Sequence, residues 1–161
     1  MVAILKQPYP QLRRMRLEDL EQVTAIEIAG YEYPWTYGIF RDCLGAGYQC
    51  WVLIQPPEVI GYGVLSVAAA EAHILNVCVA PEQRGRGNGR RIVKRLIELA
   101  RWQRAARVFL EVRPTNRHAV KLYHDLGFNE IGTRPNYYPS RRGREDATVM
   151  ALELLGSDDA G

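Results

Sequence analysis

The chain has 161 residues, of which 47% are hydrophobic and 24% are charged, and its formal net charge is +3. This length allows one domain with a sizeable core, and the composition is that of a globular protein, not of a disordered or fibrous one. The apolar runs are too short to cross a bilayer, and no signal-peptide core forms before the early prolines. We expect one cytoplasmic domain over residues 1–161, with its core at about residues 11–155.

The first half of the chain predicts a short strand, two helices and three further strands. The strand is expected at residues 11–16, and apolar residues at helical spacing indicate helices over residues 18–28 and 37–44. Three runs rich in β-forming residues follow, at residues 48–55, 59–68 and 72–79. Their connections are too short for crossover helices, so the three strands should form an antiparallel meander.

The second half predicts two helices, each followed by strands. An amphipathic helix should follow residue 89, because Ile92, Leu96 and Ala100 share one face. It leads to a strand at residues 107–113, which should pair in parallel with residues 74–79 through a right-handed crossover. Asn116 and Gly127 are suitable caps for a helix over residues 116–126. We expect a final strand pair at residues 128–133 and 147–154 around a long loop, and a frayed tail at residues 156–161.

The segment from Arg84 to Gly89 reads RGRGNG and lies between a strand and a helix. Its glycines allow backbone amides to approach an anion at the helix N-terminus, which indicates a phosphate site. A Walker A loop would need a lysine at its end and a different glycine spacing. A dinucleotide fingerprint would begin directly after the strand, although Glu111 lies near where a ribose-binding carboxylate is expected. That alternative stays open, as does a glycine-rich turn without a ligand.

The cysteines and histidines predict no metal site. Cys43, Cys50 and Cys78 lack the spacing of zinc ligands and are expected to be reduced thiols in or near the core. His73 and two further histidines have no partner pattern that suggests a triad or a metal site, so we expect them to be structural or exposed. The other two are His118 and His124.

Several motifs together resemble the GNAT N-acetyltransferase superfamily. The pattern Arg84-x-x-Gly87-x-Gly89 resembles the pyrophosphate-binding motif of this superfamily. The sequence NVCVAP at residues 76–81 resembles the strand and turn that precede that motif. The sequence NRHAVKLYHDLGF at residues 116–128 resembles the next signature of the superfamily. The resemblance covers about residues 13–154. It implies a mixed α/β (α+β) GNAT fold with a central, mostly antiparallel sheet of six to seven strands, a parallel central pair and about four helices.

Other segments resemble the bacterial RimI branch of this superfamily, namely residues 33–35, 111–113, 136–139 and 143–147. RimI enzymes acetylate the N-terminal alanine of a small-subunit ribosomal protein. The resemblance therefore implies acetyl-CoA and an N-terminal peptide of a ribosomal protein as partners. It requires no metal, membrane or nucleic acid, and we expect a monomer or weak dimer.

The resemblance also implies site residues. The glycine-rich loop at residues 84–89 and the strand before it would bind acetyl-CoA. The strand would do so through backbone groups, which are left unpaired if the parallel strands separate beyond Val79. The coenzyme-binding candidates are Val77, Cys78, Val79, Arg84, Gly85, Arg86, Gly87, Asn88, Gly89, Arg90 and Asn116. Tyr33, Trp35 and Tyr138 would border the peptide groove.

Glu111 is the candidate base, acting directly or through a water, and Tyr123 is the candidate acid for the departing thiolate. An α-amine, with a pKa of about 7.7 to 8.0, loses its proton more easily than lysine at about 10.4. Tyrosine, near 10, is a weaker acid than a thiol near 8.5, so a hydrogen bond to the thiolate is an alternative to full proton transfer. Glu111 could instead be a surface carboxylate paired with Arg107 or Arg113, and Tyr123 could be a core residue.

Three alternative functions stay open on the sequence alone. The same chemistry would serve an acetyltransferase of small-molecule amines or of protein lysine. A noncatalytic acyl-CoA sensor would use the glycine-rich loop alone, although the presence of Glu111 and Tyr123 argues against it. A nucleic-acid-binding module would use the two arginine clusters, at residues 84–95 and 141–144, although no aromatic RNA-binding signature accompanies them.

Overall fold

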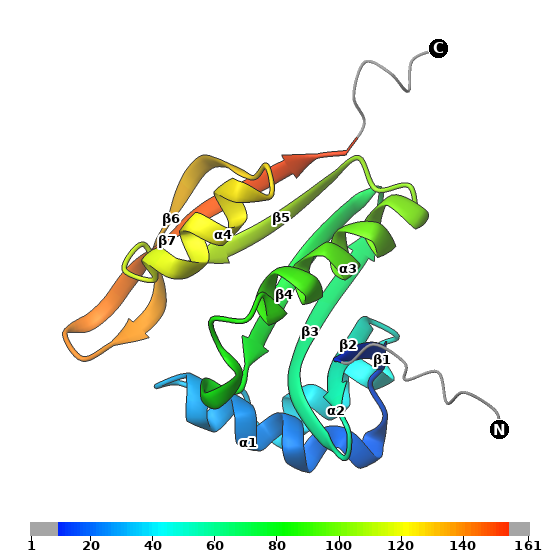
Figure 1. The fold of residues 1–161 in the computed structure, drawn as a ribbon. Helices are drawn as coiled ribbons and strands as arrows, with labels where there is room; N and C mark the ends of the chain where they lie inside the picture. The colour runs from blue at the N-terminus through cyan, green and yellow to red at the C-terminus, as the bar shows by residue number, and fades with distance from the viewer. Residues whose placement is uncertain (1–9, 155–161) are drawn as a thin grey trace, which may run out of the picture.

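The computed structural model describes residues 10–154, and this range contains a seven-stranded sheet and four α-helices (Figure 1). The strands are β1 Gln11–Arg14, β2 Gln49–Gln55, β3 Glu58–Ala68, β4 Glu71–Val79, β5 Arg107–Val112, β6 Asn129–Ser140 and β7 Gly143–Glu153. The helices are α1 Leu20–Gly30, α2 Tyr37–Gly45, α3 Asn88–Trp102 and α4 Arg117–Asp125, with 3-10 turns at Leu17–Asp19 and Pro81–Gln83. The expected tail at residues 156–161 lies outside the described residues.

The sheet has the strand order β1-β2-β3-β4-β5-β7-β6. Strands β2, β3 and β4 form the predicted antiparallel meander, and β4 pairs in parallel with β5 after the crossover through α3. All other pairs in this range are antiparallel. The predicted mixed fold is confirmed, and its one parallel pair lies at the centre of the sheet.

The parallel strands separate earlier than the sequence indicated. The expected parallel pairing of residues 74–79 is wrong, because β4 pairs with β5 through residues 71–73 and 107–109. The strands separate after His73 and Phe109, before Ile74 and not beyond Val79 (Figure 1). The register of β4 on β3 shifts at this point, where Val64 lies opposite Asn76 and the next residue of β3 lies opposite Ile74. Leu75 is thus an extra residue in β4, and such a bulge bends a strand and ends its pairing.

The expected long loop before β7 is wrong, because β6 and β7 continue as a hairpin to Ser140 and Gly143. The pairing is interrupted between Arg134 and Tyr138, where Asn136 has a positive φ of 55°. Sequence periodicity is lost at such an irregularity, although β-forming tyrosines continue beyond it. The hairpin projects from the sheet beside α4 (Figure 1).

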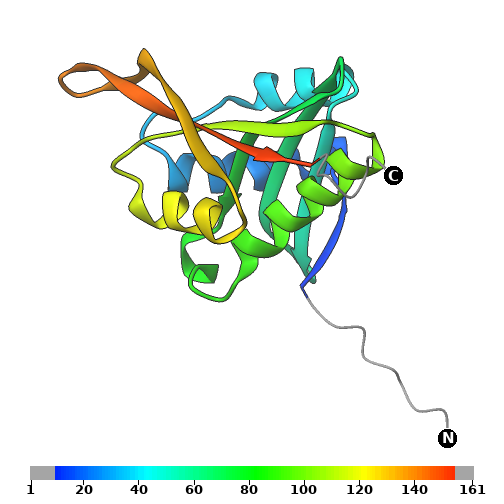
Figure 2. The same ribbon diagram turned by 90° about the horizontal axis from the view of Figure 1, so that it is seen from above.

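Helices cover both faces of the sheet, with α3 and α4 on one face and α1 and α2 on the other (Figure 2). Each face has its own apolar core. The first core packs Ile92 and Leu96 of α3 against β3, β4 and β5, and the second packs Leu20 and Phe40 against β2 and β3. In residues 10–154, no helix is long and apolar enough to cross a bilayer.

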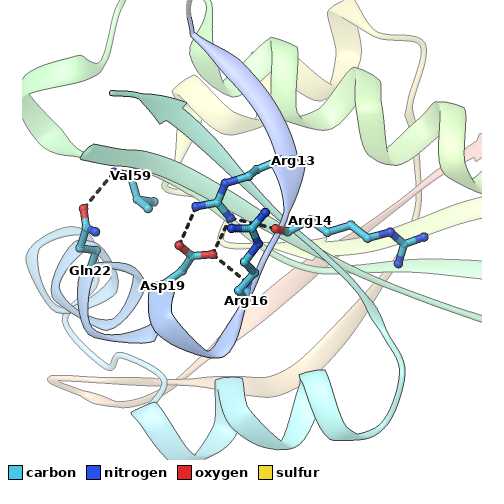
Figure 3. A network of polar contacts seen from close by, with 6 residues as sticks. All are labelled: Arg13, Arg14, Arg16, Asp19, Gln22 and Val59. Carbon is cyan, nitrogen blue, oxygen red and sulfur yellow. Dashed lines mark hydrogen bonds and ion pairs between the residues drawn. The ribbon is translucent and has the colours of Figure 1, made fainter. Parts of the chain in front are cut away.

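A polar network fixes the start of α1 to the sheet edge (Figure 3). The buried carboxylate of Asp19 accepts hydrogen bonds from both terminal nitrogens of Arg13, at 2.7 and 2.8 Å, and from the backbone amide of Arg16 at 2.7 Å. Gln22 Oε1 accepts a hydrogen bond from the amide of Val59 at 2.9 Å. Burial alone would raise the pKa of Asp19, but the bonds from Arg13 and Arg16 lower it overall.

We expect Asp19→Asn to lower the free energy of unfolding by about 2–3 kcal/mol, because it leaves the Arg13 guanidinium without its anionic partner. Urea unfolding at neutral pH measures this loss. Since folding lowers the pKa of Asp19, its stabilisation is present above the ordinary value of 3.8 and lost as the pH falls through the lower folded value. The difference between variant and wild type should therefore shrink in acid. Asp42→Asn, at an exposed pair with Arg41, is the control and should change stability by less than about 0.5 kcal/mol.

Candidate active site

The divergence of β4 and β5 opens a cleft of about 1110 Å³. Its walls come from six parts of the chain: the connection after α1, the end of β4, the glycine-rich loop with the start of α3, the end of β5, α4, and the β6–β7 hairpin. A sheet whose central strands separate exposes backbone groups that a ligand can pair with. The bulge at Leu75 therefore creates the site.

The β4 wall offers backbone groups rather than a reactive thiol. Val77 and Val79 line the cleft, and the carbonyl of Val77 accepts a hydrogen bond of 2.6 Å from the Tyr31 hydroxyl. The Cys78 side chain is buried against α1, with its Sγ 3.9 Å from the carbonyl of Ile26. Burial raises the pKa of this thiol, so Cys78 is not an activated nucleophile.

The glycine-rich loop presents unpaired amides at the start of α3. Arg84 donates through Nε to the carbonyl of Val79 at 3.1 Å, which holds the loop against the end of β4. Gly85 and Gly87 have φ values of 76° and 79°, a conformation that favours glycine. The buried Asn88 side chain donates to the carbonyl of Gln83 at 2.9 Å. The amides of residues 87–90 have no acceptor within residues 10–154, and with the helix dipole they suit an anion.

Nearly all coenzyme-binding candidates border the cleft. They are Val77, Cys78, Val79, Arg84, Gly85, Gly87, Asn88, Gly89, Arg90 and Asn116. Arg86 does not line it, and its side chain bonds to Gln83 at 3.3 Å instead. Asn116 also caps α4, accepting a hydrogen bond from the amide of Ala119 at 3.3 Å.

Glu111 extends from β5 at the point where the strands separate, and only 5% of its side chain is exposed. Its Oε2 lies 2.5 Å from His73 Nε2, and its Oε1 lies 3.4 Å from Arg134 Nε. No hydrogen bond reaches Oε1 within the described range. The alternative pairing with Arg107 or Arg113 is wrong, because these bind Glu153 and Glu145. His73, which the sequence did not link to a partner, thus contacts the candidate base.

Tyr123 of α4 lies on the opposite side of the cleft from β4. Its ring is buried edge-on against Phe128, with 5.6 Å between ring centroids, and it lines the cleft together with Glu111. Burial raises the pKa of its hydroxyl to about 12. The site therefore makes Tyr123 a weaker acid than free tyrosine, which favours a neutral hydrogen-bond donor over a proton donor.

A smaller aromatic pocket of about 340 Å³ opens beside Glu111. It contains all three predicted peptide-groove residues, Tyr33, Trp35 and Tyr138. Arg113 lies 4.3 Å above the Tyr138 ring and bonds to Glu145 at 2.8 Å and to the carbonyl of Pro139 at 3.0 Å. The β6–β7 hairpin, where the sequence pattern predicts a loop, thus supplies one wall of this pocket.

Glu27 is a site residue that the sequence analysis missed. Its carboxylate is buried and accepts hydrogen bonds from the Tyr62 hydroxyl, from Asn76 Nδ2 at 2.9 Å and from the amide of Trp35 at 2.8 Å. These bonds hold the connection after α1 against β3 and β4. Glu27 follows Val23 by one helical turn on the buried face of α1, and a carboxylate at such a position is the signal that could have revealed it.

Comparisons with known proteins agree on one family. The family model described as Acetyltransferase (GNAT) family matches residues 10–128. The [ribosomal protein bS18]-alanine N-acetyltransferase of Escherichia coli K12 is 36% identical over 136 residues, 84% of this chain and 92% of that protein. A putative enzyme of the same name from Bacillus subtilis is 34% identical over 145 residues, 89% of this chain and 95% of that one. The crystal structure of the E. coli ribosomal-protein-S18-alanine N-acetyltransferase has a TM-score of 0.84 at 33% identity, covering 93% of this chain and 98% of that one.

Proposed function

The chain belongs to the acetyltransferase (GNAT) family, and we propose that it transfers the acetyl group of acetyl-CoA to the α-amine of the N-terminal alanine of ribosomal protein bS18. The substrate is supported by the names of relatives that are 36% and 34% identical and that this chain covers over more than nine-tenths of their length. The observation that carries the proposal is the opening of two compartments on one buried carboxylate, Glu111.

The larger compartment fits acetyl-CoA. The unpaired amides of residues 87–90 and the N-terminus of α3 would hold the pyrophosphate, where the positive end of the helix dipole meets its charge. The edge of β4 that no longer pairs with β5 would lie along the pantetheine arm, which would compete with Tyr31 and Arg84 for the carbonyls of Val77 and Val79. Bound acetyl-CoA supplies the thioester carbonyl that the amine attacks. Tyr123 of α4, which lines the same compartment, would donate a hydrogen bond to the sulfur.

The smaller compartment fits the peptide. Its aromatic walls and its place beside Glu111 suit a short N-terminal residue, whose amine would approach the base from this side. Because Glu111 Oε1 is buried but lacks a hydrogen bond, it can accept a proton once a substrate or a bridging water enters. An α-amine near pKa 8 loses that proton to a carboxylate more readily than a lysine near 10.4 does.

A peptide panel tests the substrate. The purified chain is incubated with acetyl-CoA and peptides that carry the bS18 N-terminal sequence with alanine, serine or glutamate at position one. Mass spectrometry then separates α-amine from lysine products. We expect α-amine acetylation, fastest with alanine. A peptide blocked at its N-terminus is the matched control and should not react. Lysine-only products, or faster acetylation of small free amines, would contradict the proposal.

We expect Gly87→Val to weaken acetyl-CoA binding by about tenfold. A β-branched residue is strained at a φ of 79° by about 1–2 kcal/mol, so the loop should relax, and binding would have to restore the strained form. Calorimetry with acetyl-CoA measures the change. Gly47→Val, at a φ of 77° after α2 and away from the cleft, is the matched control. It should lower stability but leave the coenzyme Kd unchanged. Equal Kd values for both variants would show that the loop does not hold the coenzyme.

A further inference from the structure

The burial of Glu111 creates a problem of proton release. If the α-amine arrives as an ammonium, the overall reaction converts the ammonium and the thioester into an amide, a thiol and one proton. That proton is first accepted by Glu111, while the proton lost from the attacking nitrogen ends on the leaving sulfur. Because only 5% of the Glu111 side chain is exposed, and because substrates would fill both compartments that it borders, the accepted proton needs another way to solvent.

His73 lies between Glu111 and solvent. It occupies the last paired position of β4, beside Phe109 of β5, and its Nε2 is 2.5 Å from Glu111 Oε2. Its side chain is 31% exposed, yet it lines neither the cleft nor the aromatic pocket. The exposed part of the imidazole therefore reaches solvent outside the compartments that acetyl-CoA and peptide would occupy.

The other charged neighbour of Glu111 cannot carry the proton. Arg134 lies 3.4 Å from Oε1, but a guanidinium stays protonated and has no acceptor atom. An imidazole can accept at one nitrogen and release from the ring again, and it does so within the physiological pH range. Of the described residues within hydrogen-bond distance of this carboxylate, His73 is the one suited to proton transfer.

We propose that His73 carries the proton from Glu111 to solvent, a role that rests on the proposed function of Glu111. Glu111 takes a proton from the substrate ammonium at Oε1. The carboxylic acid then turns so that the oxygen that carries this proton faces His73, and the proton passes to Nε2 of the neutral imidazole, whose own proton is on Nδ1; this restores the carboxylate and forms an imidazolium. The imidazolium gives its Nδ1 proton to water outside the cleft, and exchange with water returns the neutral ring to its Nδ1-protonated form. Between turnovers the contact between Nε2 and Oε2 orients Glu111 so that Oε1, which lies 3.4 Å from Arg134 but accepts no hydrogen bond from the described residues, faces the substrate side.

Two substitutions separate proton transfer from orientation alone. His73→Gln keeps a donor for Oε2 but cannot carry a proton, and His73→Ala removes both and leaves space for free imidazole. We expect both to lower kcat about 10- to 100-fold, with the KM values for peptide and acetyl-CoA changed less than threefold. Added imidazole should restore part of the turnover of His73→Ala, but none of that of Glu111→Gln. His124→Gln, on α4 and outside both compartments, should retain the wild-type kcat.

The outcomes are distinct. A kcat of His73→Gln within twofold of wild type would overturn the relay and leave only an orienting hydrogen bond. A slow His73→Ala that imidazole does not accelerate would also overturn it, and thermal unfolding of each variant shows whether the fold is intact. Failure of the proposed function would be seen in the wild type itself, as an absence of α-amine acetylation, whereas failure of the relay would be seen only in the His73 variants.

Discussion

Glu111→Gln is expected to lower kcat about 100-fold or more while leaving acetyl-CoA binding unchanged. Glutamine has nearly the shape of glutamate, so it keeps the packing at the end of β5 and can still meet Arg134 and His73. It cannot accept the substrate proton, and general base catalysis typically contributes 10²- to 10⁴-fold. Steady-state kinetics with an alanine peptide, together with calorimetry for acetyl-CoA, would measure both quantities.

The matched control is Glu153→Gln. Glu153 is paired with Arg107 at the other end of β5, at 2.6 Å, and it does not border the cleft. Removing its charge should leave kcat within twofold of wild type. If Glu111→Gln kept a wild-type kcat with intact coenzyme binding, the proton would have to be accepted elsewhere, and the assignment of the base would be wrong.

Tyr123→Phe is expected to lower kcat about 10- to 100-fold. The hydroxyl has a pKa of about 12, against about 8.5 for a thiol, so full transfer of its proton to the thiolate would be uphill by on the order of 5 kcal/mol. A hydrogen bond to the developing thiolate requires no such transfer, and bonds to charged groups contribute about 1.5–3 kcal/mol. Phenylalanine removes only this bond, because the ring keeps its packing against Phe128.

The pH dependence of turnover shows whether the Tyr123 hydroxyl transfers its proton or only donates a hydrogen bond. Since the pKa of Tyr123 is raised, the hydroxyl stays protonated through neutral and moderately alkaline pH, and no loss of activity below about pH 11 should arise from its ionisation. The profile of Tyr123→Phe should therefore be lower than that of the wild type but of the same shape. A missing alkaline limb in the variant would instead identify Tyr123 as a titrating acid. Tyr48→Phe, an exposed residue outside the cleft, should match the wild type.

Features set by local sequence were predictable. Asn116 caps α4 and Gly127 ends it because a side-chain acceptor and a residue with φ of 100° act within one turn of the helix. The meander likewise followed from short connections. The candidate residues on β4, the glycine-rich loop and α4 could be placed near each other because one crossover through α3 brings β5 beside β4, and α4 follows β5 directly.

Features set by pairing across the chain were not predictable from periodicity. The partners of Glu27 lie at residues 35, 62 and 76, and the contact between His73 and Glu111 depends on the register of only three parallel residue pairs. The continuation of β6 and β7 past Asn136 depends on the pairing of each strand with the other. In each case the stabilising contact is made with a residue that is distant in the sequence, so a local sequence pattern carries no information about it.

The extra residue in β4 also sets the phase of the strand. Before it, Ala72 and Ile74 belong to the core beneath α3; after it, the even-numbered Cys78 belongs to the core beneath α1, and Val79 belongs to the other. Side chains alternate with a period of two, so pairing the same residues without the bulge would invert every later position and turn Asn76 toward the apolar core beneath α3. Deleting one residue here would keep every later side chain on its present face, but it would remove the bulge that ends the pairing of β4 with β5. The segment should therefore accept many substitutions, whereas a single-residue deletion should close the cleft. Its length, as much as its composition, is part of the information that specifies this enzyme.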